Sequence, residues 1–304
     1  MGTVFRRWWN SDLCWSWRHA PVAMVATVVL LLLLAGSFGA GWVAPHDPFD
    51  LASIELLDAL LPPVWDDNGT AKYLLGTDSQ GRDLYSALLY GMRVSLLIGL
   101  ASVLASMLLG IVLGLLSGYV GGRVDAFIMR VADVQLSFPA ILIALLIDGV
   151  ARAAVPRELH EVIAFPVLIG AIALAGWPQY ARTVRGSTLV EKNREYVQAA
   201  RVIGVSSPAI MFQHVLPNVM GPVLVLATVH VATAIITEAT LSFLGVGVPP
   251  TSPSLGTLIR IGNDFLFSGE WWITIFPGAA LVLLVLSVNL VGDWLRDALN
   301  PRLN

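Results

Sequence analysis

Six apolar stretches alternate with shorter polar segments along the chain. A helix needs about 20 apolar residues to cross the hydrocarbon core of a bilayer. The stretches of sufficient length are residues 22–43, 94–122, 126–148, 162–181, 218–244 and 272–292. Hydrophobic residues make up 56% of the whole chain and charged residues only 13%. The pattern therefore predicts an all-α integral membrane protein with six transmembrane helices.

The polar segments divide the chain into parts. We expect a cytoplasmic N-terminal segment at residues 1–20, a first transmembrane helix at 21–44, an extracytoplasmic loop at 45–90, a five-helix core at 91–296 that contains a cytoplasmic loop at 183–217, and a cytoplasmic tail at 297–304. An even number of spans puts both termini on one face. Lysine and arginine are about twice as frequent on that face as on the other, which favours a cytoplasmic location for it.

Small and charged residues inside the spans predict helix contacts. Gly110, Gly114 and Gly118 recur every four residues, a spacing typical of closely packed transmembrane helices. Glu238 is an acid at membrane depth, and we expect it either to bond to a neighbouring helix or to serve function directly. In the third span, Arg130 and Asp133 are spaced to form a salt bridge.

Proline and polar residues within the spans carry two further expectations. Pro139 follows Phe138 and predicts a kink in the third span. The polar side chains that are candidates for lining a substrate path are Gln135, Ser137, Gln179 and Asn218. Polarity alone selects these four, and hydrogen bonds between helices are the alternative use for each of them.

The 183–217 loop is polar in its first half and predicts two short helices. Gly204 is placed to end the first helix in the left-handed conformation. Ser206 or Ser207 can cap the second helix, with Pro208 in its first turn. Such a helix pair would move as a rigid lever. An amphipathic loop lying at the membrane interface is the alternative.

The chain lacks the motifs of the common catalytic and metal sites. Its lysines are Lys72 and Lys192, and neither lies in a GxxxxGK[ST] phosphate-binding loop, so any ATP must be hydrolysed by another polypeptide. Cys14 is the single cysteine, and no GxSxG elbow or metal-spaced histidine pair occurs. A net charge of −3 argues against a nucleic-acid partner.

Four ordered stretches resemble signatures of bacterial ABC-importer permeases. Gln198-Ala199-Ala200, followed by Gly204 and Leu216-Pro217, resembles the cytoplasmic EAA loop of these proteins, with Gln198 where Glu is usual. Residues 75–95, 129–139 and 238–256 resemble signatures of the second, C-type permease of dipeptide and oligopeptide importers in the peptide/nickel family. In the last of these, Leu255 replaces the usual Trp.

This resemblance implies a type I permease fold in the inner (cytoplasmic) membrane, with a cytoplasmic coupling helix. It implies a heterodimer with a second homologous permease, surrounded by membrane lipid, together with two ATP-binding subunits and an extracytoplasmic substrate-binding protein. ATP and Mg would bind to the partner subunits, so this chain is expected to be no enzyme and to hold no cofactor or metal. The resemblance assigns coupling to the ATPase to Glu195, Gln198, Ala199, Ala200, Arg201, Gly204, Met211, Phe212, Leu216 and Pro217.

The implied function is ATP-driven import of peptides, and of dipeptides first. Relatives with these signatures also carry nickel chelates, glutathione and other small solutes. A second hypothesis is a secondary carrier or channel that works without ATP, but the spans hold few of the charged groups that ion coupling uses. A third, a membrane-embedded enzyme, lacks a nucleophile and base in any recognisable arrangement.

Overall fold

The computed structural model describes residues 12–50 and 54–298, and every regular element in this part of the chain is a helix. The α-helices are α2 (Asp12–Arg18), α3 (Pro21–Phe38), α4 (Ala40–Val43), α5 (Leu84–Val120), α6 (Gly122–Leu136), α7 (Ala140–Ala153), α8 (His160–Glu191), α9 (Glu195–Val202), α10 (Ser207–Ala209), α11 (Leu216–Phe243), α12 (Leu255–Asn263) and α13 (Trp272–Ala298). Two 3₁₀ turns, Leu56–Asp58 and Arg157–Leu159, and a π-helix, Ile210–Val215, complete the set. The all-α prediction is confirmed.

Five helical segments of the described chain are long and apolar enough to cross a membrane, and α6 with α7 makes six if the pair counts as one span. The expected kink at Phe138–Pro139 is far sharper than a bend in one helix, since α6 and α7 meet at 98°. Pro139 has no N–H to continue the ladder of hydrogen bonds, and its extended backbone turns the chain. The third span is therefore a broken helix or a re-entrant loop.

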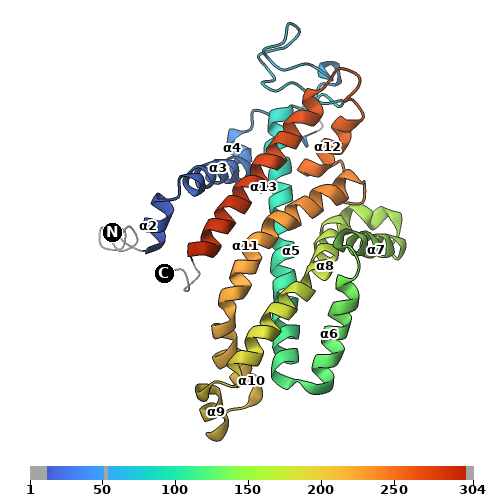
Figure 1. Cartoon of the computed structure of the whole chain (residues 1–304). Coiled ribbons are helices and arrows are strands. Elements are labelled where there is room, and N and C mark those ends of the chain that lie inside the picture. The colour runs from blue at the N-terminus through green and yellow to red at the C-terminus, as the bar shows by residue number, and fades with distance from the viewer. Residues whose placement is uncertain (1–11, 51–53, 299–304) are drawn as a thin grey trace.

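Helix α5 is the axis of the molecule (Figure 1). Its first turn is capped by Asp83, whose carboxylate accepts a hydrogen bond of 3.0 Å from Ser86 N, and it ends at Gly121, where φ is +72°. At 37 residues it is roughly 55 Å long, well beyond the ~30 Å of a bilayer core. It therefore joins the end of the molecule formed by the 54–83 loop and α12 to the opposite end, near α9 and α10.

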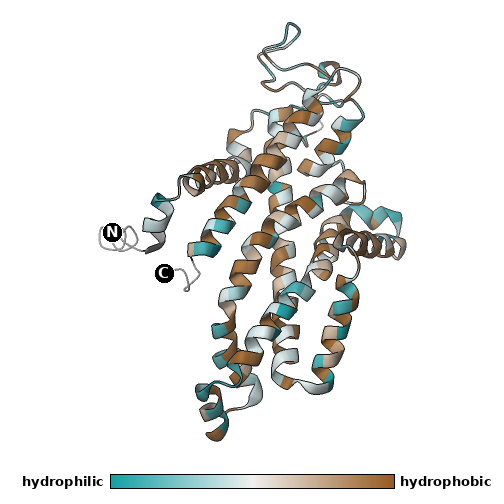
Figure 2. Cartoon of the chain, viewed as in Figure 1, coloured by the Kyte–Doolittle hydropathy of each residue, from teal (hydrophilic) through white to brown (hydrophobic). Residues whose placement is uncertain are grey.

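The core lies where α5, α8 and α11 meet. Its buried side chains include Leu115 from α5, Tyr180 from α8 and Val219 from α11. Many large hydrophobic residues of the long helices are exposed, and these helices are largely brown in Figure 2. This is the pattern of a bundle that faces hydrocarbon on its outside, since lipid tails impose no penalty on exposed leucine and valine.

Several boundaries differ from the expected ones. The first transmembrane helix breaks at Gly39, between α3 and α4. Helix α5 begins at Leu84, inside the expected 45–90 loop, and α8 continues to Glu191, so the first residues of the 183–217 loop extend the preceding span. Most of the 1–20 segment and of the 297–304 tail lies outside the described residues.

Candidate functional site

The 183–217 loop forms a compact projection at one end of the bundle (Figure 1). Helix α9 buries Val197 and Ala200 against the core, which leaves Glu195, Gln198 and Ala199 on its outer side. Gly204 has φ +85°, the left-handed conformation that glycine adopts without steric cost. Directly after it, Val205 N donates a 3.0 Å hydrogen bond to Ala200 O. The second helix has Pro208 in its first turn as expected, but the Ser206 side chain makes no cap bond.

The outer surface of this projection is apolar. Val202 is 87% exposed and Ile203 79% exposed, at the end of α9, and Phe212 is 51% exposed on the neighbouring π-helix. Met211 was expected to contact a partner, but it is only 6% exposed and belongs to the core. The sequence interpretation missed Val202 and Ile203. Their signal is an apolar pair directly before a glycine in a polar loop.

Hydrogen bonds and a cation–π contact hold the projection to the ends of three long helices. Tyr196 Oη donates to Glu191 Oε2 at 2.7 Å and accepts from Asn218 Nδ2 at 3.2 Å, so α9 is tied to α8 and α11. Arg201 lies 5.2 Å from the ring centroid of Tyr119 at the end of α5, a cation–π contact. Burial, reinforced by the hydrogen bond to Glu191, raises the pKa of the Tyr196 phenol.

The remaining expected coupling residues lie around this scaffold. Leu216 is half-buried against the core and Pro217 is exposed in the first turn of α11. Lys192 Nζ donates a 2.7 Å hydrogen bond to Gly118 O at the end of α5. The projection is thus continuous with the helices behind it, and a force on its tip would act on α5, α8 and α11 together.

The glycine ladder of α5 lies against α8. A Cβ added to Gly110 would lie 2.3 Å from Tyr180 Cβ, and one added to Gly114 would lie 2.6 Å from Ala181 O. The same holds at Gly118, where Thr188 Cβ would be 2.7 Å away. These distances are below contact distance, so α5 and α8 approach each other closely because glycine occupies these positions.

Charged pairs join α6 to α8. Arg185 Nε donates to Asp125 Oδ1 at 2.5 Å, and Arg182 Nη2 donates to Asp133. The expected Arg130–Asp133 bridge is therefore replaced by a contact between helices. The spacing of three within α6 allowed the local pair, but Arg182 approaches Asp133 from α8.

At the opposite end of the bundle, polar side chains hold the connecting loops to the helices. Asp78 accepts hydrogen bonds from Arg82 N and Nε, at 3.0 and 2.7 Å, and Arg82 Nη1 donates to Pro250 O at 3.2 Å. The N-cap of α5 is Asp83, which directly precedes the first turn. On α7, Arg152 pairs with Asp148 and donates to the carbonyl oxygen of Gly247 at 3.0 Å.

Of the four candidate path residues, three form the hydrogen bonds described next, and the fourth, Gln179, faces a hollow. Asn218 lies at the projection, and Ser137 Oγ donates to Asp133 O at 2.9 Å on its own helix. Gln135 donates to the carbonyl oxygens of Leu174 and Ala175 on α8. Pro178 has no N–H for Leu174 O, so Gln135 supplies the hydrogen bond that this proline removes.

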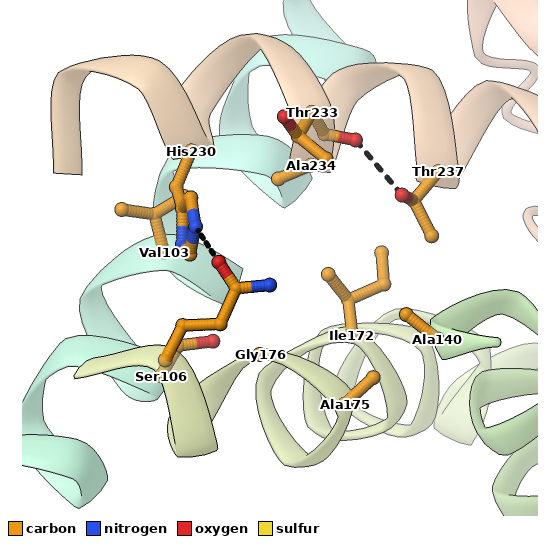
Figure 3. Close-up of a pocket in the computed structure, with 11 residues that line it drawn as sticks. Val103, Ser106, Ala140, Ile172, Ala175, Gly176, His230, Thr233, Ala234 and Thr237 are labelled. Atoms are coloured by element: carbon orange, nitrogen blue, oxygen red, sulfur yellow. Dashed lines mark hydrogen bonds between the residues drawn. The ribbon is translucent and has the colours of Figure 1, made fainter. Parts of the chain in front are cut away.

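Gln179 is the candidate that faces an open hollow, which lies between α5, α8 and α11. His230 Nε2 donates to Gln179 Oε1 at 2.7 Å, since an amide oxygen only accepts. In Figure 3, His230, Thr233 and Thr237 of α11 line one side of this hollow, with Ile172 and Ala175 of α8 across from them. The described residues contain no group of three or more His, Cys, Asp or Glu side chains that could hold a metal ion.

Comparison with known proteins identifies the family to which this architecture belongs. Residues 110–304 match the family model for the inner membrane component of binding-protein-dependent transport systems, and residues 8–63 match the N-terminal transmembrane domain of oligopeptide transport permease C. The chain therefore belongs to the family of inner-membrane permease components of binding-protein-dependent transport systems.

Relatives within this family narrow the comparison. The chain is 42% identical over 289 residues to the di/tripeptide transport system permease protein DppC of Pseudomonas aeruginosa (strain UCBPP-PA14), covering 95% of this chain and 90% of the relative. It is 44% identical over 286 residues to the dipeptide transport system permease protein DppC of Escherichia coli (strain K12), covering 92% and 89%.

A solved structure shares the fold. A chain of the MetNI methionine ABC transporter, in an inward-facing conformation, superposes with a TM-score of 0.55 at 19% identity and covers 70% of this chain and 96% of its own. The expected type I permease fold of ABC importers is confirmed.

Proposed function

We propose that this chain is a transmembrane permease subunit of an ATP-driven importer that carries peptides, and above all dipeptides, across the cytoplasmic membrane. The observation that carries the proposal is 42% identity to a di/tripeptide permease over 95% of this chain. Identity of that extent includes the spans, the outer loops and the 183–217 projection together. A shared function follows more naturally from it than from the fold alone, which many transporters use.

The chain hydrolyses no ATP itself in this proposal. Two ATPase subunits bind ATP and Mg, and the apolar tip formed by Val202, Ile203 and Phe212 seats in one of them. Exposed apolar patches rimmed by polar residues are typical of protein contacts, and Glu195, Gln198 and Arg201 provide that rim here. Closure of the ATPase pair would push this tip and tilt α5, α8 and α11, so that the bundle alternates between two conformations.

Orientation and assembly complete the proposal. The projection and both termini lie in the cytoplasm, and the 54–83 loop with α12 faces outward, where a substrate-binding protein delivers the peptide. The contact between α2 and α13 supports a shared side for the two ends of the described chain. A second, homologous permease forms the other half of the path, because the hollow beside His230 is open on the surface of this chain.

The test is dipeptide uptake by a bacterial strain that lacks this permease and depends on a dipeptide for a required amino acid. The wild-type gene, expressed with its partner subunits, should restore growth. Val202→Asp should abolish growth, because a charge buried in the contact with the ATPase is costly. Val202→Leu is the control, since it keeps the apolar surface and should support growth. Failure of the wild-type gene to restore uptake would refute the proposal.

A further inference from the structure

Polar side chains line the hollow between α5, α8 and α11, at a depth of the bilayer where polar groups are costly. His230 lies halfway along the apolar run at residues 218–244, and Gln179 meets it from α8. Thr233 is exposed on the surface of this chain, one turn beyond His230. Polar side chains at this depth normally face the interior of a bundle or a water-filled path, because contact with hydrocarbon is costly. This face of α11 therefore turns toward a path and away from lipid.

The lining side chains have hydrogen-bonding capacity to spare. His230 uses Nε2 for its bond to Gln179 Oε1, which leaves Nδ1 as an acceptor and the Gln179 amide nitrogen as a donor, neither of which is bonded to another described residue. Thr237 Oγ1 donates to Thr233 O at 2.8 Å, and the Thr233 hydroxyl donates to Val229 O at 3.4 Å. Each hydroxyl has thus used its proton within its own helix and keeps its oxygen lone pairs as acceptors.

The hollow is one wall of a larger space. Its volume of about 70 Å³ is far below the several hundred Å³ of a typical ligand pocket. Its floor includes Gly176, which lets α8 lie close to α5, since a Cβ there would lie 2.8 Å from Ser106 Oγ. The wall contains no charged residue among those that line it. It therefore has no electrostatic means of selecting one kind of peptide side chain.

We propose that this wall is a subsite for the backbone of the transported peptide, in which His230 and the Thr233 and Thr237 hydroxyls accept hydrogen bonds from the amide N–H and the α-ammonium group of the peptide, and Gln179 donates to its carbonyl oxygen. This inference rests on the proposed function above and specifies the chemistry of the path. Hydrogen bonds from uncharged side chains suit a path that must admit peptides of many sequences and release them again. A site that bound more strongly would hold the peptide. Recognition is then by the backbone that all peptides share.

The test uses the complete complex of permeases, ATPase subunits and binding protein in proteoliposomes, with alanyl-alanine as the probe. The double variant Thr233→Val with Thr237→Val preserves side-chain shape and removes both acceptors. We expect its ATP-driven uptake, per assembled complex, to fall about 3- to 10-fold, as the loss of one or two net hydrogen bonds implies. Thr240→Val is the matched control. Its hydroxyl also donates within α11, to Ile236 O at 2.7 Å, but it lies outside the hollow, and uptake should stay within twofold of wild type.

A second measurement separates this inference from the proposed function. A dipeptide of alanine and photoreactive diazirine-leucine is irradiated in the purified complex, and the labelled residues are mapped by mass spectrometry. Labelling of α8 and α11 around His230 supports the subsite. Wild-type uptake by the double variant, or labelling that avoids these two helices, overturns it. Absence of uptake by the wild-type complex would count against the proposed function, and the labelling would still decide about the hollow.

Discussion

Ser95 on α5 donates a hydrogen bond of 2.7 Å to the carboxylate of Glu238 on α11. Ser242, one turn further along α11, donates to the other carboxylate oxygen, also at 2.7 Å. The same Ser95 oxygen accepts a 3.2 Å bond from Leu255 N at the start of α12. Glu238 is fully buried, so this small network links α5, α11 and α12 inside the bundle. Its geometry assigns the intramembrane acid a role in joining helices.

Removing the Glu238 carboxylate should therefore lower the stability of the folded bundle. We expect Glu238→Ala to reduce the free energy of unfolding by about 1–3 kcal/mol, because two buried serine hydroxyls lose their acceptor. Glu238→Gln keeps an oxygen acceptor and the side-chain shape, so its loss should be smaller. Thermal unfolding of the purified complex in detergent compares the two. An alanine variant as stable as wild type would contradict the network.

Glycine-to-alanine substitutions should have different effects at two sites, one in the glycine ladder of α5 and one outside it on α8. Gly110→Ala places a methyl group 2.3 Å from Tyr180 Cβ and should destabilise the bundle by about 1–3 kcal/mol through overpacking. Gly170→Ala on α8 meets no atom within 4 Å and should be neutral or stabilise by up to about 1 kcal/mol, since alanine favours helix. Yield and melting temperature of the two variants are the measurements. Equal effects at both positions would mean that α5 and α8 are not in close contact.

The left-handed turn at Gly204 should be required for coupling. Gly204→Val forces a β-branched residue into a conformation that costs it roughly 1–2 kcal/mol or more, and this should displace the Val202–Ile203 tip. Gly204→Asn is the control, because asparagine tolerates the left-handed region. We expect ATP-driven uptake to be lost in the valine variant and largely kept in the asparagine variant, with both inserted in the membrane. Normal uptake with valine would contradict a rigid lever.

The 54–83 loop should respond to acid through Asp58. Its carboxylate accepts bonds of 2.8 Å from Lys72 Nζ and from Tyr73 Oη, and the Lys72 hydrogen bond, then that of Tyr73, holds the pKa of Asp58 below its ordinary value. A carboxylate whose pKa is lowered in the folded state stabilises the fold at pH values above its unfolded pKa of about 4. This stabilisation is lost as the pH falls through the pKa of the folded state. Proteolysis of the 54–83 loop should therefore accelerate below about pH 4 in wild type.

The matched variant for that experiment is Asp58→Asn. It has no carboxylate to protonate, so its loop should be cleaved faster than that of wild type at neutral pH and should change less between pH 5 and pH 3. An acid-resistant protease is needed for the comparison. Parallel pH profiles of wild type and variant would show that Asp58 does not anchor the loop.

Sequence reasoning succeeded where a single residue type determines the backbone. Gly204 was placed in a left-handed turn because glycine adopts that conformation readily, and the structure has it there. The apolar runs likewise predicted the spans, since a bilayer allows little else. Pro139 was expected to bend the third span, but the size of the bend depends on how α7 packs on α8 and on Arg152 reaching Gly247, which no local pattern contains.

Contacts between distant segments were the part that the sequence could not supply. Met211 and Val202 are both apolar residues in one polar loop, and only the packed helices show that Met211 points inward and Val202 outward. Gln135 was chosen for its polarity, whereas its partner is the carbonyl that Pro178 leaves free on α8. His230 was not selected at all, although a histidine in the middle of an apolar run is a signal that could have been used.

The most direct test of ATP coupling through the 183–217 projection is site-specific cross-linking in the assembled complex. Cys14 is the single native cysteine and is first replaced by serine, after which Ile203→Cys carries a short cysteine-linked photo-cross-linker. The account predicts a cross-link to an ATPase subunit, and none to an ATPase from Val162→Cys, a 72% exposed position at the end of α8 that lies away from the projection. Capture of the extracytoplasmic binding protein by the Ile203 position, or its labelling by an impermeant thiol reagent from outside the cell, would contradict it.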